Sequence, residues 1–250
     1  MKLAVVTIRR EPFYRRNAVE QGLKRLGYQV VSSGLRPTGK DSLLVLWNKK
    51  KGKEEQDADR WESQGGTVLV LENGYLQRTD KSYYAISVHG HNGSGYFPVG
   101  DGDRFTPLGF PIKPMRTAGS EVVVRAQRGI GSVLMASPPQ WAEKFTAKLK
   151  SQGVPARLIT HPGNFSPKVP PVTDLAKARE MHIWCSSMGV LALTLGIPVR
   201  HHAPHWVCEG WEKDREVALR RMAWGQWSVD EIARGEPFAC VLDNLGSAKW

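Results

Sequence analysis

The chain has 250 residues, of which 41% are hydrophobic and 24% are charged, and its formal net charge is +11. This length suits one large domain or two small ones, and the composition is that of a soluble globular protein that can bury a sizeable core. No apolar run approaches the roughly 20 residues that a membrane-spanning helix needs, so no membrane span is expected.

The net charge indicates what kind of partner the protein binds, and the cysteine content indicates in which cellular compartment it is found. The basic excess favours a polyanionic partner, such as nucleic acid, an acidic glycan or an anionic membrane surface, although the basic residues are dispersed. Residues 1–10 are predicted to form a strand that is followed by charged residues, a pattern that differs from a secretion signal. The three cysteines, Cys185, Cys208 and Cys240, show no disulfide pattern, so a cytoplasmic protein is expected.

The first half of the chain alternates apolar strands with helical spacing, as a Rossmann-like unit does. Segment 3–7 is nearly all apolar, which is typical of a central parallel strand. Helical spacing covers residues 17–26, and Gly27 is well placed to end that helix. Further strands are predicted at 28–31, 43–47, 67–71 and 84–88, and a partly helical charged segment at 49–64.

Glycine and proline dominate residues 89–119, where no periodicity is visible. A long segment of this kind is usually functional or a linker between domains. We therefore expect an N-terminal domain over residues 1–118 and a C-terminal domain over residues 119–250.

The second half repeats the α/β pattern. Strands are predicted at 121–126, 157–160, 181–184 and 197–199, and helices at 138–151, 173–178, 190–195, 214–224 and 228–234. Two successive halves of this kind predict an α/β fold with two Rossmann-like domains that face one another across a cleft.

Two strand ends of the second half carry residues suited to binding a phosphate. Ser186, Ser187, Met188 and Gly189 turn one strand into a helix, and such a turn presents backbone N–H groups at the positive end of a helix dipole. His161 and Pro162 end the preceding strand, and neighbouring parallel strands can end at one edge. Ordinary helix capping by Ser187 and a surface turn at His161 remain the alternatives.

A third turn, Gln127-Arg128-Gly129, follows the strand predicted at 121–126. Negative charge grows on a leaving nucleoside phosphate, and Arg128, His161 and helix N-terminal N–H groups can stabilise it without a metal. A solvated turn arginine is the alternative reading of Arg128.

The order of these motifs resembles the C-terminal domain of GT-B glycosyltransferases. His161-Pro162 and Ser186-Ser187 match the His-Pro and Ser-Ser motifs of the capsule-polysaccharide and sialyltransferase-like groups, and Gly196-Ile-Pro-Val199 matches the strand that follows the donor-site helix. Segment 224–232 is similar to bacteriophage glycosyltransferase-like proteins. The resemblance implies a two-domain GT-B-like fold and a metal-independent transferase whose C-terminal domain binds a nucleotide-sugar.

Catalytic groups on the acceptor side are expected from the first half. His89 and His91 follow the strand at 84–88, and a histidine can take the proton of an acceptor hydroxyl. Glu72, after the strand at 67–71, is the carboxylate option. Each of these residues also has a purely structural reading as part of a loop.

Metal binding is the minority interpretation of His201, His202, His205 and Cys208, because Pro204 interrupts their spacing and no second motif pairs with them. No metal and no cofactor are predicted beyond the nucleotide-sugar co-substrate.

The sequence thus predicts a glycosyltransferase. The acceptor favoured by the positive charge and the phage resemblance is a modified base in DNA. A capsule or other cell-surface glycan is the alternative acceptor, and a non-enzymatic nucleic-acid-binding protein on the same fold is the alternative function.

Overall fold

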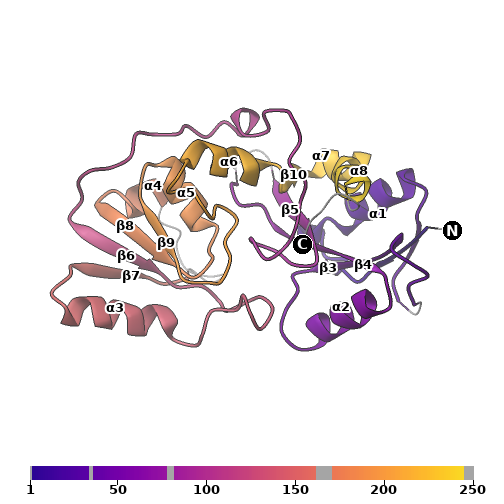
Figure 1. Ribbon diagram of the computed structural model, residues 1–250, viewed down its shortest axis with the longest axis horizontal. Helices are drawn as coiled ribbons and strands as arrows, with labels where there is room; N and C mark the ends of the chain where they lie inside the picture. Colours follow the sequence, from indigo (N-terminus) through magenta and orange to yellow (C-terminus); the bar gives the residue numbers. More distant parts are fainter. Residues whose placement is uncertain (1, 34–35, 78–81, 162–170, 245–250) are drawn as a thin grey trace.

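The computed structural model describes residues 2–33, 36–77, 82–161 and 171–244. It contains two β-sheets that lie side by side, each with helices on both faces (Figure 1). Apolar strands covered on both faces are the reason why the central strands read as continuous hydrophobic runs, as in β1, where every residue is buried.

The first sheet has six strands, in the order β10-β5-β4-β3-β1-β2. Its parallel part is β1 (Leu3–Val6), β2 (Gln29–Val31), β3 (Ser42–Trp47) and β4 (Thr67–Asn73). Strand β5 (Tyr83–Val88) runs antiparallel to β4, and β10 (Gln226–Ser228) runs antiparallel to β5.

Helices α1 (Arg16–Arg25), α7 (Val229–Arg234) and α8 (Glu236–Asp243) cover one face of this sheet, and α2 (Lys53–Ser63) covers the other. Gly22 in α1 allows α7 to approach, since a Cβ atom at this position would lie 2.0 Å from the carbonyl oxygen of Ile232. A short 3-10 turn, η1 (Pro12–Tyr14), precedes α1.

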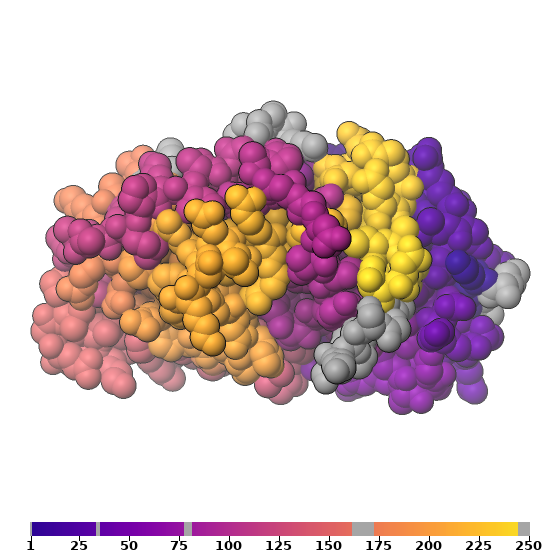
Figure 2. Space-filling view, turned by 45° about the horizontal axis from the view of Figure 1, so that its top comes forward, coloured from indigo at the N-terminus to yellow at the C-terminus, as the bar shows by residue number. Residues whose placement is uncertain are grey.

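The C-terminal residues thus return to the first sheet, where Figure 2 shows them (yellow) packed on the N-terminal part (indigo). The helix predicted at 228–234 is present as α7, with Ser228 and Glu231 forming a capping box. Strand β10 and helix α8 were not predicted. The division of the chain after residue 118 stays a prediction, to which the structure adds that residues 226–243 pack on the first sheet.

The second sheet has four parallel strands in the order β7-β6-β8-β9. They are β6 (Glu121–Arg125), β7 (Ala156–Ile159), β8 (Ala178–Ile183) and β9 (Val199–His201), with helices α3 (Trp141–Ser151), α4 (Pro171–Asp174), α5 (Met188–Thr194) and α6 (Arg215–Ala223). The expected α/β architecture of two Rossmann-like bodies is confirmed.

The glycine- and proline-rich segment after β5 runs over the first body to the second (Figure 1). It contains a second 3-10 turn, η2 (Thr106–Leu108), and its side chains Phe105 and Leu108 are buried. Arg104 lies 3.7 Å from the ring centre of Trp227 and forms an ion pair with Glu231. The segment is therefore packed onto both bodies rather than extended through solvent.

No helix in the described part of the chain combines the length and the apolar character needed to cross a membrane.

Candidate active-site cleft

A cleft of about 180 Å³ lies between the two bodies. The first body contributes residues from the ends of β3 and β4 and from the loop after β5, and the second contributes residues from the ends of β6, β7 and β8. The lining residues are Asn48, Glu72, Asn73, Tyr75, His91, Asn92, Gln127, Arg128, Ile130, His161, Cys185, Ser186 and Ser187. Predicted site residues from both halves of the chain therefore meet in one cavity.

Glu72, near the end of β4, is a carboxyl group largely removed from water. Burial raises its pKa to about 8, against the opposing effect of hydrogen bonds from the Tyr75 side chain and the Asn92 backbone. The adjacent carboxyl in turn contributes to raising the pKa of Tyr75, after burial itself. At neutral pH, Glu72 is consequently protonated in most molecules, and it becomes a base as the pH rises through 8.

His91, in the loop after β5, lines the same cleft as Glu72. Its side chain is buried, and burial lowers its pKa to about 4, so that the ring is neutral at physiological pH. A neutral imidazole can accept a proton at one nitrogen and donate one at the other.

Among the described side chains that line the cleft, three have a buried polar atom without a hydrogen-bond partner: Glu72 Oε1, His91 Nδ1 and Asn92 Oδ1. Buried polar atoms in folded proteins are paired in the large majority of cases, and each exception needs a cause. A polar ligand or ordered water in the cleft would supply the missing partners.

The loop after β5 reaches the cleft by an indirect path. Because β5 is antiparallel to β4, its carboxyl end lies beside Leu69, far from the carboxyl end of β4. The loop folds back, and the Asn92 side-chain amide donates a hydrogen bond to the Cys185 carbonyl oxygen of the second body.

His89 takes another direction from His91. Its Nδ1 lies 2.5 Å from Glu62 Oε1 on α2, and His89 is not among the residues that line the cleft. The two histidines are only two residues apart in the chain, but of the two only His91 lines the cleft.

The second body holds the Ser186-Ser187 turn through the peptide of Cys185. The Cys185 N–H donates to Gln127 Oε1 at 3.0 Å, while its carbonyl oxygen accepts from Asn92. Gln127, from the end of β6, thereby links two strand ends, and burial raises the pKa of the Cys185 thiol to about 12. The thiol stays protonated and forms a passive part of the cleft wall.

The four predicted donor residues of this turn separate into two pairs. The N–H groups of Met188 and Gly189 donate to Oγ and the carbonyl oxygen of Ser186, at 3.2 and 3.0 Å. Ser187, the N-cap of α5, makes no side-chain capping bond. Within the described ranges, the N–H groups of Ser186 and Ser187 have no partner, whereas those of Met188 and Gly189 are used inside the turn.

Packing explains Gly189 independently of any ligand. A Cβ atom there would lie 2.5 Å from Ile183 Cδ1 and 2.8 Å from Trp206 Cζ2. Gly189 is buried and, like Met188, does not line the cleft.

Arg128 and His161 form an exposed, cationic side of the cleft. Partial burial lowers the pKa of His161, and the charges of Arg128 and Arg125 lower it further. Both Arg128 and His161 line the cleft. Pro162, the other half of the His-Pro motif, lies outside the described residues.

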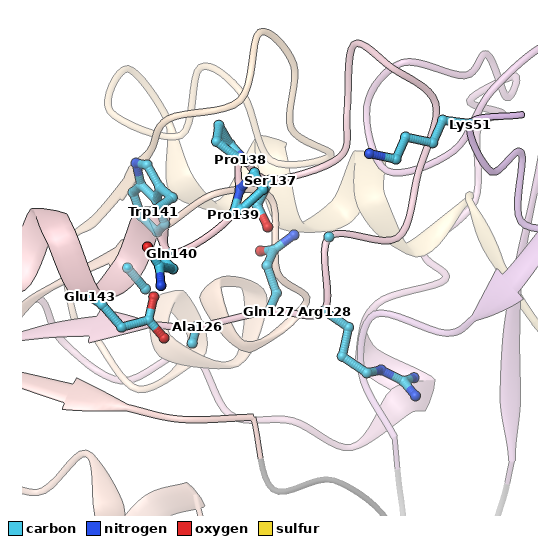
Figure 3. A pocket seen from close by; sticks show the side chains of 12 residues that line it. Lys51, Ala126, Gln127, Arg128, Ser137, Pro138, Pro139, Gln140, Trp141 and Glu143 are labelled. Carbon is cyan, nitrogen blue, oxygen red and sulfur yellow. The ribbon is translucent and has the colours of Figure 1, made fainter.

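A second pocket, of about 410 Å³, adjoins the cleft through Gln127, Arg128 and the adjacent Gly129. Its wall includes Ser137 to Glu143, at the start of α3. Figure 3 shows Lys51 of the first body reaching toward this outer pocket, whereas Arg128 turns away from the Pro138 and Trp141 wall. Gly129 has φ 62°, a conformation that favours glycine, which explains its place in the turn.

No group of three potential metal ligands occurs among the described residues. In the cluster considered from the sequence, His201 Nδ1 lies 3.1 Å from the Ala203 carbonyl oxygen, His205 lies 3.7 Å from Glu209, and Cys208 is buried. His202 instead lies 2.9 Å from His182 Nδ1.

Comparison with known proteins relates this geometry to a fold. No family model matches the chain, and no curated protein matches it. Two solved structures from Thermosulfurimonas dismutans are similar, the KpsC β-Kdo 2,4 transferase and the KpsC β-Kdo 2,7 transferase. The first is 14% identical with a TM-score of 0.55 over 93% of this chain and 98% of its own. The second is 13% identical with a TM-score of 0.57 over 94% and 98%.

The likeness covers both bodies of the chain, since it extends over more than nine-tenths of the sequence. It shows that the protein shares the fold of these Kdo transferases, which is the GT-B-like architecture that the His-Pro and Ser-Ser motifs imply. Sequence identity at this level establishes the fold and leaves the activity to be argued from the site.

Proposed function

We propose that the protein is a glycosyltransferase that moves a sugar from a nucleotide-sugar to a hydroxyl group of a cell-surface glycan. The observation that carries the proposal is the cleft itself. It combines a buried carboxyl group and unpartnered polar atoms on one side with an exposed arginine and histidine on the other. Such a pairing suits a reaction in which a proton leaves one reactant and negative charge grows on the other.

The second body would hold the donor phosphate. Arg128 supplies a positive charge, and the N–H groups of Ser186 and Ser187 are available to donate hydrogen bonds to an anion. His161 lies in the same cationic region. Stabilisation of the leaving phosphate by these groups requires no metal ion.

The first body would hold the acceptor and its base. Glu72 is the better candidate, because its carboxyl group has a pKa near 8 and an unpartnered oxygen in the cleft. His91, with a pKa near 4, is a weak base that suits a neutral hydrogen-bonding role at the acceptor hydroxyl. His89 has no place in this mechanism, since its ring pairs with Glu62 outside the cleft.

A glycan acceptor is better supported than the modified DNA base favoured by charge alone. Both similar structures are named as transferases of a sugar, Kdo, and neither name refers to a nucleic acid. The glycan acceptor considered as the alternative at the sequence level therefore becomes the main proposal.

Calorimetric titration with UDP-, GDP- and CMP-linked sugars, including CMP-linked Kdo, tests the donor half of the proposal. We expect one nucleotide class to bind, and we expect Arg128→Ala to weaken it while Arg179→Ala, an exposed arginine on β8, does not. Incubation with surface glycans and with hydroxymethylated DNA, followed by mass measurement, then identifies the acceptor. A chain that binds no nucleotide-sugar would refute the transferase proposal.

A further inference from the structure

The loop between β1 and α1 carries a group of exposed side chains that the proposed reaction does not use. Arg9, Arg10 and Arg15 are exposed, and Phe13 between them is 56% exposed. We call residues 9–15 the arginine–phenylalanine loop. The exposed ring lies among three cations and one exposed anion, Glu11, and both apolar surface and unpaired positive charge favour a partner.

The arginine–phenylalanine loop is held in place rather than left to move freely. Buried Arg16 donates to the Ile8 carbonyl oxygen at 2.6 Å and to Ser32 Oγ at 2.7 Å, directly behind the loop. Tyr84 donates from its hydroxyl to the Phe13 carbonyl oxygen at 2.8 Å. Little conformational entropy would be lost when a ligand binds to a loop that is already ordered.

The charges of the loop are not neutralised inside the protein. Across the described ranges, Arg9 and Arg15 form no ion pair, and Arg10 approaches Glu20 only to 3.9 Å. The Phe13 ring makes T-shaped contacts with Tyr14 and Trp47, with ring centres 5.2 and 5.7 Å away. The positive charge and part of the ring surface therefore remain available to solvent.

The loop adjoins the cleft through the two residues that support it. Trp47, which contacts the Phe13 ring, is followed by Asn48, and Asn48 lines the cleft. Tyr84 is paired across the sheet with Asn73, which also lines the cleft. Both contacts lie where β3 and β4 end, on the Glu72 side of the cavity.

We infer that the arginine–phenylalanine loop is a docking subsite for an acidic stretch of the acceptor glycan, several sugars away from the hydroxyl that reacts. This inference rests on the proposed function and adds the chemical class of the acceptor. Arginine forms paired hydrogen bonds with carboxylate or phosphate groups, and the C–H face of a sugar ring stacks on an exposed aromatic face. Uronate or other carboxylated sugars match both features.

Direct binding measurements on the full chain, without donor, test the subsite. The probes are a short oligogalacturonate, a neutral dextran of the same length, a short DNA duplex and vesicles containing phosphatidylglycerol. We expect the oligogalacturonate to bind and the dextran not to bind. The double variant Arg9→Gln/Arg15→Gln should weaken oligogalacturonate binding by at least about tenfold, a loss of about 1.4 kcal/mol in binding free energy.

Lys148→Gln/Lys150→Gln is the matched control, because it removes the same net charge from two exposed positions on α3. We expect it to change oligogalacturonate binding by less than about twofold. Phe13→Ala should weaken binding at unchanged net charge, which separates stacking from general attraction.

The outcomes separate this inference from the proposed function. Equal losses in the arginine and lysine variants, or stronger binding to DNA or vesicles than to the oligogalacturonate, would overturn the subsite. If nucleotide-sugars bind but the loop variants leave oligogalacturonate binding unchanged, the subsite inference fails and the transferase proposal stands. A protein that binds the oligogalacturonate through the loop but no nucleotide-sugar would refute the transferase proposal instead.

Discussion

The two sides of the cleft differ in solvent exposure and in charge. On the first-body side, His91 and Asn92 are buried, Glu72 is partly buried, and each has a buried polar atom without a partner. On the second-body side, Arg128 and His161 are exposed. The first side is built by a strand end and a folded-back loop, and the second by turns at the ends of three parallel strands.

This contrast assigns the two sides different physical tasks. Burial removes water from Glu72 and raises its pKa into the range where a carboxylate is a useful base. Exposure lets the guanidinium group of Arg128 meet an incoming anion. The Asn92–Cys185 hydrogen bond joins the sides, so the position of one depends on the other.

The largest expected effect tests the buried side. Glu72→Gln keeps the size of the side chain and removes its ability to take a proton, so kcat should fall by about 10²- to 10⁴-fold while nucleotide-sugar affinity stays near wild type. Glu212→Gln, on an exposed residue, is the control and should leave kcat unchanged. A loss of affinity with kcat preserved would place Glu72 on the donor side.

Removing the main cation tests the exposed side. Arg128→Ala should weaken nucleotide-sugar binding by about 10- to 100-fold, because a hydrogen bond to a charged group contributes about 1.5–3 kcal/mol. Calorimetry on the variant and on Arg179→Ala measures the difference. If both variants bind alike, Arg128 is only a solvated turn residue.

The pH dependence of the rate compares the two sides in one experiment. Because the folded pKa of Glu72 is near 8, kcat/KM should rise about tenfold per pH unit below 8 and level off above it. His91, with a pKa near 4, stays neutral across this range. A rate that falls as the pH rises through 8 would identify Glu72 as an acid rather than a base.

The smallest expected effect is on thermal stability, which tests the burial of Glu72 without any substrate. The pKa of Glu72 is raised from 4.5 to about 8, so the folded state retains the proton and loses stability as the pH rises between these values. Glu72→Gln should therefore raise Tm at pH 8 by several degrees and change it little at pH 4. For a protein of this size, each kcal/mol of unfolding free energy shifts Tm by about 2–4 °C. Thermal unfolding at both pH values measures this, and an equal shift at both would contradict it.

Local patterns in the sequence account for most elements of the fold. The apolar runs before residues 8, 48 and 126 are strands, and Gly27 follows the first helix with φ 81°. These features depend on neighbouring residues only, so they can be read from periodicity and capping. The antiparallel direction of β5 cannot, because a strand of the same composition fits either direction.

The residues predicted at strand ends lie together in the cleft, while their roles stay predictions. Glu72, Gln127, Arg128, His161, Ser186 and Ser187 all line the cavity. Asn48, Tyr75, Asn92 and Cys185 also line it and were not predicted as site residues. An asparagine after a glycine and histidine reads as an ordinary loop until its contact with Cys185, 93 positions away, is known.

The sequence by itself determined the two α/β bodies, the turns that carry Gln127-Arg128 and Ser186-Ser187, and the excess of positive charge. The tertiary structure alone decided that His91 enters the cleft while His89 pairs with Glu62. It also decided that β10 joins the first sheet and that α7 and α8 cover it. It also decided how far Glu72 is removed from water. Helix and turn formation depends on residues close in the chain, whereas burial and strand direction depend on which distant segments come together.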